Sequence, residues 1–141
     1  MRRAIQISAV AAAMMLLAAC ATGGKSPAAG AQTAGERAVA RWQAIIDRKA
    51  ELAYDYLTPG VRSSKTREGY ASEQTQKPLT YLSVALDDED CAADACTVRV
   101  ELQYELAIPI EGITRKRYPA FVEERWVRID GSWFLLPDAY R

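Results

Sequence analysis

Residues 97–106 read Thr97-Val98-Arg99-Val100-Glu101-Leu102-Gln103-Tyr104-Glu105-Leu106, and this stretch decides the fold class. Apolar or aromatic side chains occupy every even position, and polar side chains occupy every odd position. Side chains of a β-strand point alternately to opposite faces, so the pattern predicts a long strand with one buried and one solvated face. Strands of this kind are typical of antiparallel sheets that are packed on one side.

Three further strands are predicted around this stretch. Residues 82–86 alternate in the same way, residues 121–129 form another strand-like run, and residues 132–136 follow it closely. The dipeptide Asp130-Gly131 between the last two runs is typical of a two-residue hairpin turn. Two prolines and a glycine indicate a loop or irregular edge before the third run, bracketed by Pro109, Gly112 and Pro119.

The region before the strands has the period of a helix. Across residues 36–57, apolar residues recur at spacings of three and four, namely Val39, Trp42, Ile45, Ile46, Leu52, Ala53 and Tyr56. Asp47-Arg48-Lys49 is expected to break this stretch, and Thr58-Pro59-Gly60 is expected to end it. Ser63 or Ser64 would then cap a third, short helix. Helices followed by antiparallel strands predict an α+β domain with a sheet of about four strands.

The N-terminus has the layout of a secretory signal. Arg2 and Arg3 precede an uninterrupted apolar run, residues 9–19, which ends in small residues at a cysteine. This run is shorter than the about 20 residues that a bilayer span needs, which disfavours the alternative of a transmembrane anchor. An ordinary secretory signal that is cut nearby is the other alternative.

The segment Leu17-Ala18-Ala19-Cys20 resembles the lipobox of bacterial lipoproteins. The resemblance implies removal of residues 1–19, a diacylglyceryl group on the Cys20 thiol and often a further fatty acid such as palmitate on nitrogen. Two or three acyl chains anchor a protein stably, because each buried methylene contributes about 0.8 kcal/mol. No acidic residue follows Cys20, which by the sorting preference described for enterobacteria favours the outer membrane, facing the periplasm, over the inner membrane.

Composition divides the rest of the chain into a tether and one domain. Residues 20–35 are small and polar, which predicts a flexible linker, and residues 36–141 are enough for a single compact domain. Without Arg2 and Arg3, the 18 basic residues fall to 16 against 18 acidic residues, so nucleic-acid binding is disfavoured. The sequence contains no histidine, which removes the commonest general base and metal ligand. We therefore expect no metal and no cofactor.

The domain resembles the nuclear-transport-factor-2-like family. The resemblance lies in the first helix with Trp42, in the helix end Tyr54-Asp55-Tyr56-Leu57-Thr58-Pro59, and in the closing hairpin Trp126…Asp130-Gly131-Ser132-Trp133. It implies N-terminal helices over a strongly curved antiparallel sheet that encloses a cone-shaped cavity. A cystatin-like sheet wrapped around one helix is the structural alternative. Related domains include isomerases, cyclases and dehydratases as well as non-catalytic binding and dimerising modules, so the fold does not fix the function.

A candidate pocket follows from this resemblance. If the face of the 121–129 strand with Glu124 and Trp126 lines the cone, Glu124 is the candidate acid or base, and Tyr104 is a donor on the neighbouring strand. Trp42 and Tyr56 would complete a small apolar pocket. The alternatives are that the aromatic residues fill the core and that Glu124 pairs, on a solvated face, with Arg99 or Arg128.

Cys91 and Cys96 follow an acidic run, residues 87–90, and suggest a metal pair, a redox couple or a disulfide. The acidic run lacks the ligand spacing of a calcium loop, and two thiolates without histidine make a poor zinc site. Redox couples more typically have two residues between the cysteines. An oxidising periplasm favours a disulfide, with residues 92–95 as the hairpin loop between the two cysteines.

These expectations combine into one functional hypothesis. The protein is expected to be an envelope lipoprotein, held in the membrane at Cys20, whose domain is a non-catalytic binding or scaffolding module. Its partner would be another envelope protein, or a second copy bound through the open sheet face. The alternative is a cavity enzyme or a carrier of a small hydrophobic ligand.

Overall fold

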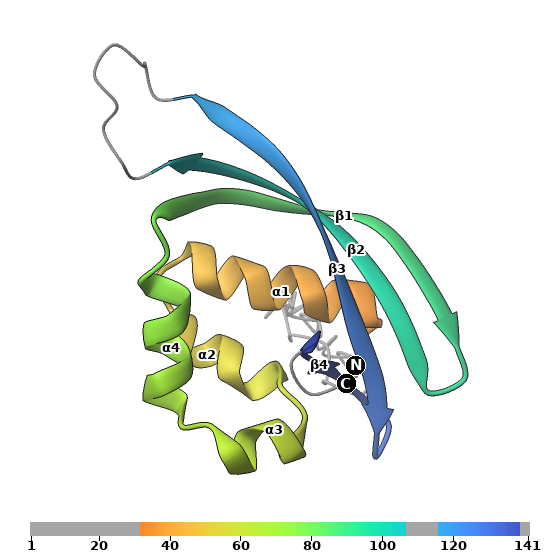
Figure 1. The fold of residues 1–141 in the computed structure, drawn as a ribbon. Coiled ribbons are helices and arrows are strands. Elements are labelled where there is room, and N and C mark those ends of the chain that lie inside the picture. The colour runs from red at the N-terminus through yellow and green to blue at the C-terminus, as the bar shows by residue number, and fades with distance from the viewer. Residues whose placement is uncertain (1–31, 107–115, 139–141) are drawn as a thin grey trace, which may run out of the picture.

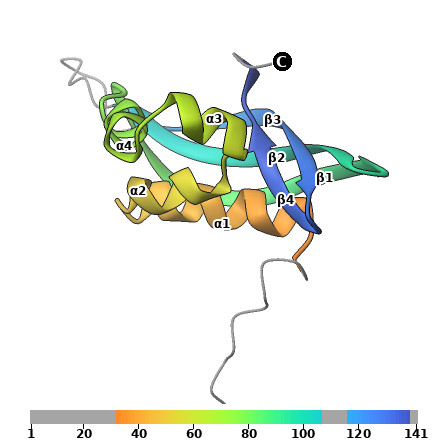
Figure 2. The ribbon, with the colours of Figure 1, turned by 90° about the horizontal axis from the view of Figure 1, so that it is seen from below.

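The computed structural model describes residues 32–106 and 116–138. An antiparallel sheet in the order β1-β2-β3-β4 bends over the N-terminal helices, and α1 lies against its concave face (Figures 1 and 2). The elements are α1 (Ala34–Ile46), α2 (Ala50–Ala53), η2 (Tyr54–Tyr56), α3 (Pro59–Ser64), α4 (Arg67–Thr75), β1 (Leu79–Ala92), β2 (Ala95–Leu106), β3 (Arg117–Ile129) and β4 (Ser132–Leu136). The α+β class with about four strands is confirmed.

The stretch that decides the fold is strand β2, as predicted. Its even-numbered apolar residues Val98, Val100 and Leu102 are completely buried, whereas Arg99 lies exposed on the outer face. β2 pairs along its length with β1 and β3, so it forms the middle of the sheet. Core residues from the helices pack against this inner face, chiefly Ala38, Trp42, Ile45, Leu57, Val61 and Tyr70.

Strand β1 is longer than predicted. It continues through the acidic run to Ala92, and the hairpin turn is only Ala93-Asp94, so the prediction of a loop over residues 92–95 was wrong in extent. Acidic residues resemble a loop in sequence, but here Asp88 and Asp90 are exposed and remain solvated within the strand. β1 is an edge strand, and its two register shifts and its charges are typical of edges protected against pairing with another sheet.

Strand β3 begins earlier than predicted and includes a proline. Pro119 lies within β3, opposite Gln103; of the two alternatives, a loop or an irregular edge, it marks an edge. Proline is tolerated there because β4 pairs only with residues 125–129 of β3, so β3 is an edge at Pro119. The other two residues of that prediction, Pro109 and Gly112, lie outside the described residues.

The helical region breaks where the sequence predicted. Asp47 caps the C-terminus of α1, and Arg48 has a φ of 62°, which interrupts the helix. Two details differ. Thr58 caps a new helix with Pro59 in its first turn, where a proline lacks no needed hydrogen bond, and Thr66 rather than Ser63 or Ser64 caps α4. Among the described residues, no helix has the length and apolar character needed to span a bilayer.

Candidate functional site

A buried carboxylate lies at the centre of the helix–sheet interface. Glu124 projects from the inner face of β3 and is 7% exposed. Its Oε1 atom accepts hydrogen bonds from Arg41 Nη1 at 2.7 Å and from Trp42 Nε1 at 2.8 Å. Its Oε2 atom accepts a hydrogen bond from Trp126 Nε1 at 3.1 Å. The carboxylate is therefore enclosed by three donors that come from α1 and from its own strand.

Glu124, Arg41, Trp42, Trp126 and Tyr70 form one cluster, in which Arg41 binds both Glu124 and Tyr70. Arg41 Nε and Nη2 donate to the Tyr70 hydroxyl of α4 at 3.1 and 2.9 Å, and the guanidinium lies 4.9 Å from the ring centroid of Trp42. Burial alone would lower the pKa of Arg41, but the charge of Glu124 and the interactions with Tyr70 outweigh burial, and the pKa is raised. Arg41 thus stays charged inside the core.

This arrangement is suited to holding elements together rather than to transferring protons. A general base needs a lone pair aimed at the substrate, and both oxygens of Glu124 already accept hydrogen bonds from the protein. The hydrogen bonds of Arg41 with Glu124 and Tyr70 join α1, α4 and β3 in a largely buried region, where charge-assisted bonds of this kind are strong.

The structure brings together most of the residues predicted to line a pocket. Trp42, Glu124 and Trp126 are all buried and in contact, and the Tyr56 ring meets the Trp126 ring edge-on at 6.5 Å. Tyr104 lies elsewhere on the inner face and pairs across the strands with Tyr118, with ring centroids 5.7 Å apart. Most of these aromatic side chains are therefore part of the core or packed against it.

The two arginines considered as solvated partners of Glu124, Arg99 and Arg128, have other contacts. Arg99 lies on the outer face and forms an ion pair with Asp87 of the neighbouring strand. The guanidinium of Arg128 lies 4.6 Å from the ring centroid of Trp133.

Sequence reasoning missed Arg41 and Tyr70 as members of the cluster. A signal was present, because Ala34, Arg37, Ala38, Arg41, Trp42 and Ile45 recur at spacings of three and four and are all buried. Two arginines on the apolar stripe of a helix indicate buried cations, and a buried cation requires a buried partner.

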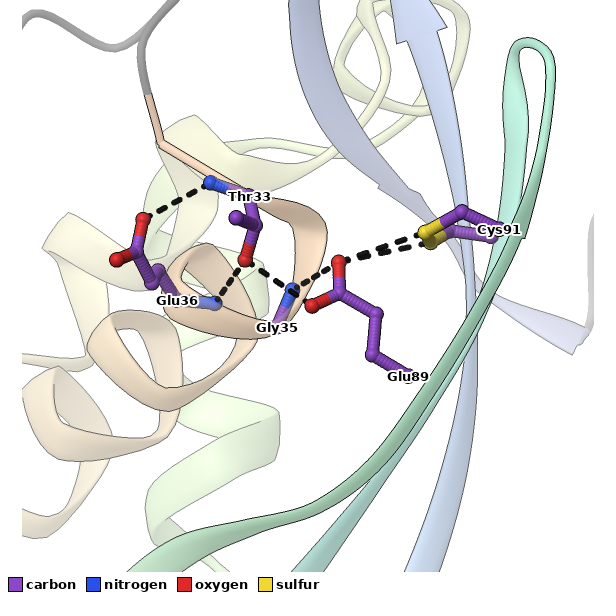
Figure 3. Close-up of a disulfide and its surroundings, with 6 residues drawn as sticks. Thr33, Gly35, Glu36, Glu89 and Cys91 are labelled. Carbon is purple, nitrogen blue, oxygen red and sulfur yellow. Dashed lines mark hydrogen bonds between the residues drawn. A yellow bond between two sulfur atoms is a disulfide. The ribbon is translucent and has the colours of Figure 1, made fainter.

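The two cysteines face each other at the tip of the β1–β2 hairpin. Cys91 and Cys96 are opposite each other in the register, with Cα atoms 4.0 Å apart, and their sulfur atoms lie at disulfide distance (Figure 3). The turn between them is short because Ala93 adopts a φ of 51°. Residue 20, the predicted lipidation site, lies outside the described residues.

Glu89 lies between these cysteines and the start of α1. Its Oε1 atom is 3.4 and 3.6 Å from the two sulfur atoms; sulfur atoms in a disulfide carry no hydrogen, so these are contacts (Figure 3). Oε1 also accepts a hydrogen bond from Gly35 N at 3.1 Å, and Oε2 accepts one from Thr33 Oγ1 at 3.1 Å. Glu89 therefore fastens the N-terminus of α1 to strand β1.

Glu89 and the two cysteines are close enough together to be considered as a metal site. The ligand atoms of Glu89, Cys91 and Cys96 lie within 4.8 Å of one another. A disulfide withdraws both thiolates and leaves one carboxylate, which is a poor donor set for a transition metal.

The start of α1 is reinforced by its own residues. Thr33 caps the helix, accepting a hydrogen bond from Glu36 N, while the Glu36 carboxylate accepts one from Thr33 N. This reciprocal capping box satisfies two backbone donors at the point where the chain enters the domain.

Comparison with known proteins places the fold but not the function. No family model matches the sequence, and no curated protein matches it. The solution structure of a SEC-C motif containing protein from Rhodopseudomonas palustris is similar, with a TM-score of 0.55 and 11% sequence identity over 72% of this chain and 73% of that chain. At this identity the likeness concerns the fold alone.

Proposed function

We propose that this protein is a bacterial envelope lipoprotein whose domain, of the nuclear-transport-factor-2-like type, is a non-catalytic binding or scaffolding module. The proposed localisation in the cell envelope rests on Leu17-Ala18-Ala19-Cys20, which follows a basic and apolar leader. The observation that carries the non-catalytic role is the enclosure of Glu124 by three donors. A cavity enzyme would need that carboxylate free to accept a proton from a substrate.

Lipidation is tested by mass spectrometry of the protein purified from bacterial membranes. The proposal expects a mature chain that begins at Cys20 and carries a diacylglyceryl group together with one further acyl chain. Cys20→Ser should remain unprocessed and lack the lipid mass, while Cys91→Ala, the matched control, should be processed normally. A wild-type chain that is cleaved at another residue and carries no lipid would contradict the proposal of a lipoprotein.

The binding role is tested by photo-crosslinking in living cells. Phe121 is 60% exposed on the outer face of the sheet and is a suitable position for a photoreactive phenylalanine analogue. A single adduct of constant mass would identify an envelope partner, and an adduct of twice the protein's mass would identify a second copy. Gln76, at the end of α4 on the opposite side of the sheet, is the control position. No adduct from either position, together with a monomer in size-exclusion chromatography, would contradict the scaffolding role.

A further inference from the structure

A second buried arginine lies outside the Glu124 cluster. Arg37, one turn before Arg41 on α1, is 6% exposed. Its Nε atom donates to the carbonyl oxygen of Trp133 on β4 at 2.6 Å. The guanidinium carbon lies 4.8 Å from the ring centroid of Tyr56 and 5.5 Å from that of Phe134. The guanidinium, which extends from α1, is therefore held by contacts with η2 and β4.

The two Nη atoms of Arg37 have no partner within residues 32–106 and 116–138. Among these described residues, the side chain of Arg37 forms one hydrogen bond, the one from Nε. In this part of the chain, no side-chain nitrogen or oxygen is both fully buried and unpaired, so both Nη atoms must reach the solvent. The small exposed part of Arg37 is thus its hydrogen-bonding end, and the rest of the side chain is packed.

This end opens into a surface cleft of about 440 Å³, lined by Arg37, Leu52, Asp55, Tyr56, Ser132 and Phe134. Leu52 is 50% exposed at its rim. Asp55 does not neutralise Arg37, because its carboxylate accepts two hydrogen bonds from Arg67, at 2.6 and 2.9 Å. Burial lowers the pKa of Arg37, an effect that Tyr56 partly offsets, and this is the mark of a cation without a full counter-charge.

We propose that this cleft binds a carboxylate that bears an apolar group. A guanidinium with both Nη atoms free presents a fork that matches the two oxygens of a carboxylate. Tyr56, Phe134 and Leu52 would contact the apolar part of the ligand. This proposal rests on the proposed binding role in one respect, the source of the carboxylate. In that role, the carboxylate belongs to an acidic side chain of the partner protein that lies beside an apolar residue.

The site is tested by titrating the whole purified chain with benzoate and following the Nε–H signal of Arg37 by NMR. This proton is hydrogen-bonded and buried, so it exchanges slowly enough to be observed. Benzoate should shift the signal to saturation, and benzamide, which has the same ring without the charge, should bind at least tenfold more weakly. Equal binding of the two probes, or a shift that never saturates, would overturn the proposal.

Three variants make the test specific, with benzoate binding followed through the backbone amide signals of Trp133 and Phe134. Arg37→Gln should weaken benzoate binding at least tenfold, whereas Arg99→Gln, with the same change in charge on the outer face, should not alter it. Leu52→Asp places a fixed anion at the cleft rim and should also weaken binding at least tenfold; because Leu52 is half exposed, this variant is expected to fold normally. Retained binding in both cleft variants would refute the site. Loss of lipidation at Cys20 would not affect this titration, so the two proposals can fail separately.

Discussion

Arg41 Nη1 lies 2.7 Å from Glu124 Oε1, and each of these side chains is only 7% exposed. The two residues are 83 positions apart, so their contact joins the first helix to the third strand. Removing two charges from water is costly, and such a pair is maintained only when the remaining donors and acceptors are satisfied. Trp42, Trp126 and Tyr70 satisfy them here. The pair therefore specifies how the helix sits on the sheet.

Replacing the carboxylate should be strongly destabilising. We expect Glu124→Gln to lower the free energy of unfolding by about 3–5 kcal/mol, because Arg41 would remain charged and buried without a counter-charge. Chemical denaturation followed by tryptophan fluorescence measures this change. Glu123→Gln is the matched control on the exposed face of the same strand, with an expected change within about 0.5 kcal/mol. Equal effects of the two substitutions would show that the buried pair has no special role.

Gly35 lies where α1 packs tightly against side chains of β1. A Cβ atom there would lie 2.8 Å from both Glu89 Oε2 and Leu86 Cδ2. We expect Gly35→Ala to destabilise the domain by about 1–3 kcal/mol through overpacking, although alanine favours helices. At Gly60 a Cβ atom would meet nothing within 4 Å, so Gly60→Ala should be neutral or stabilising by up to about 1 kcal/mol. Thermal unfolding of both variants decides the point, and a stabilised Gly35→Ala would refute the close contact.

The hairpin cysteines should act as one unit. A disulfide that closes so short a loop stabilises by about 2 kcal/mol in chain-entropy estimates. Cys91→Ala should therefore cost about this much although Cys91 is exposed, and the double variant with Cys96→Ala should cost no more than Cys96→Ala alone. Denaturation without reductant gives the three values, and peptide mass spectrometry should find Cys91 linked to Cys96. Additive losses and two free thiols would exclude the bond.

Asp55 should make stability depend on pH in the acid range. Hydrogen bonds from Arg67, with the charges of Arg67 and Arg62, outweigh burial and lower the pKa of Asp55. The folded state then binds fewer protons than the unfolded state near this pKa, so the stabilisation is present above the unfolded pKa of about 4 and is lost as the pH falls through the folded value. Asp55→Asn should be less stable than wild type at pH 7, with the gap closing below about pH 4.

The control for this titration is Asp90→Asn, at an exposed position in the hairpin. It makes the same chemical change at a position outside the Asp55–Arg67 ion pair. A constant gap for Asp55→Asn from pH 7 to about pH 2 would mean that the pKa of Asp55 does not differ between the two states.

The strands were predictable where one face is buried and the other solvated. The alternation of 97–106 and the Asp130-Gly131 turn need no tertiary information, because side-chain direction and turn chemistry are local properties. The full length of β1 was not predictable, because its acidic part is stabilised by the register with β2 and not by any apolar pattern of its own. Whether Pro119 marks a loop or an edge was not predictable either, since only the shortness of β4 makes β3 an edge there.

The candidate site was predictable in its residue types and not in its geometry. Glu124 and Trp126 share a face of one strand by simple alternation. That Arg41 would be the partner of Glu124 depends on how α1 crosses the sheet, which no local pattern specifies. The two arginines on the buried stripe of α1 were the available sign that the helix carries charge into the core, toward Glu124 at one position and toward an open cleft at the other.

Thr33 and Gly35 are where any mechanical load on the preceding chain first enters the domain, and both are hydrogen-bonded to Glu89. A pull there is passed to β1 beside Cys91, whose cross-link ties the edge strand to the fully paired β2. An edge strand alone peels away one hydrogen bond at a time, whereas two linked strands must slide together. The Cys91–Cys96 link therefore connects the N-terminus of α1, through Glu89 and β1, to the central strand β2.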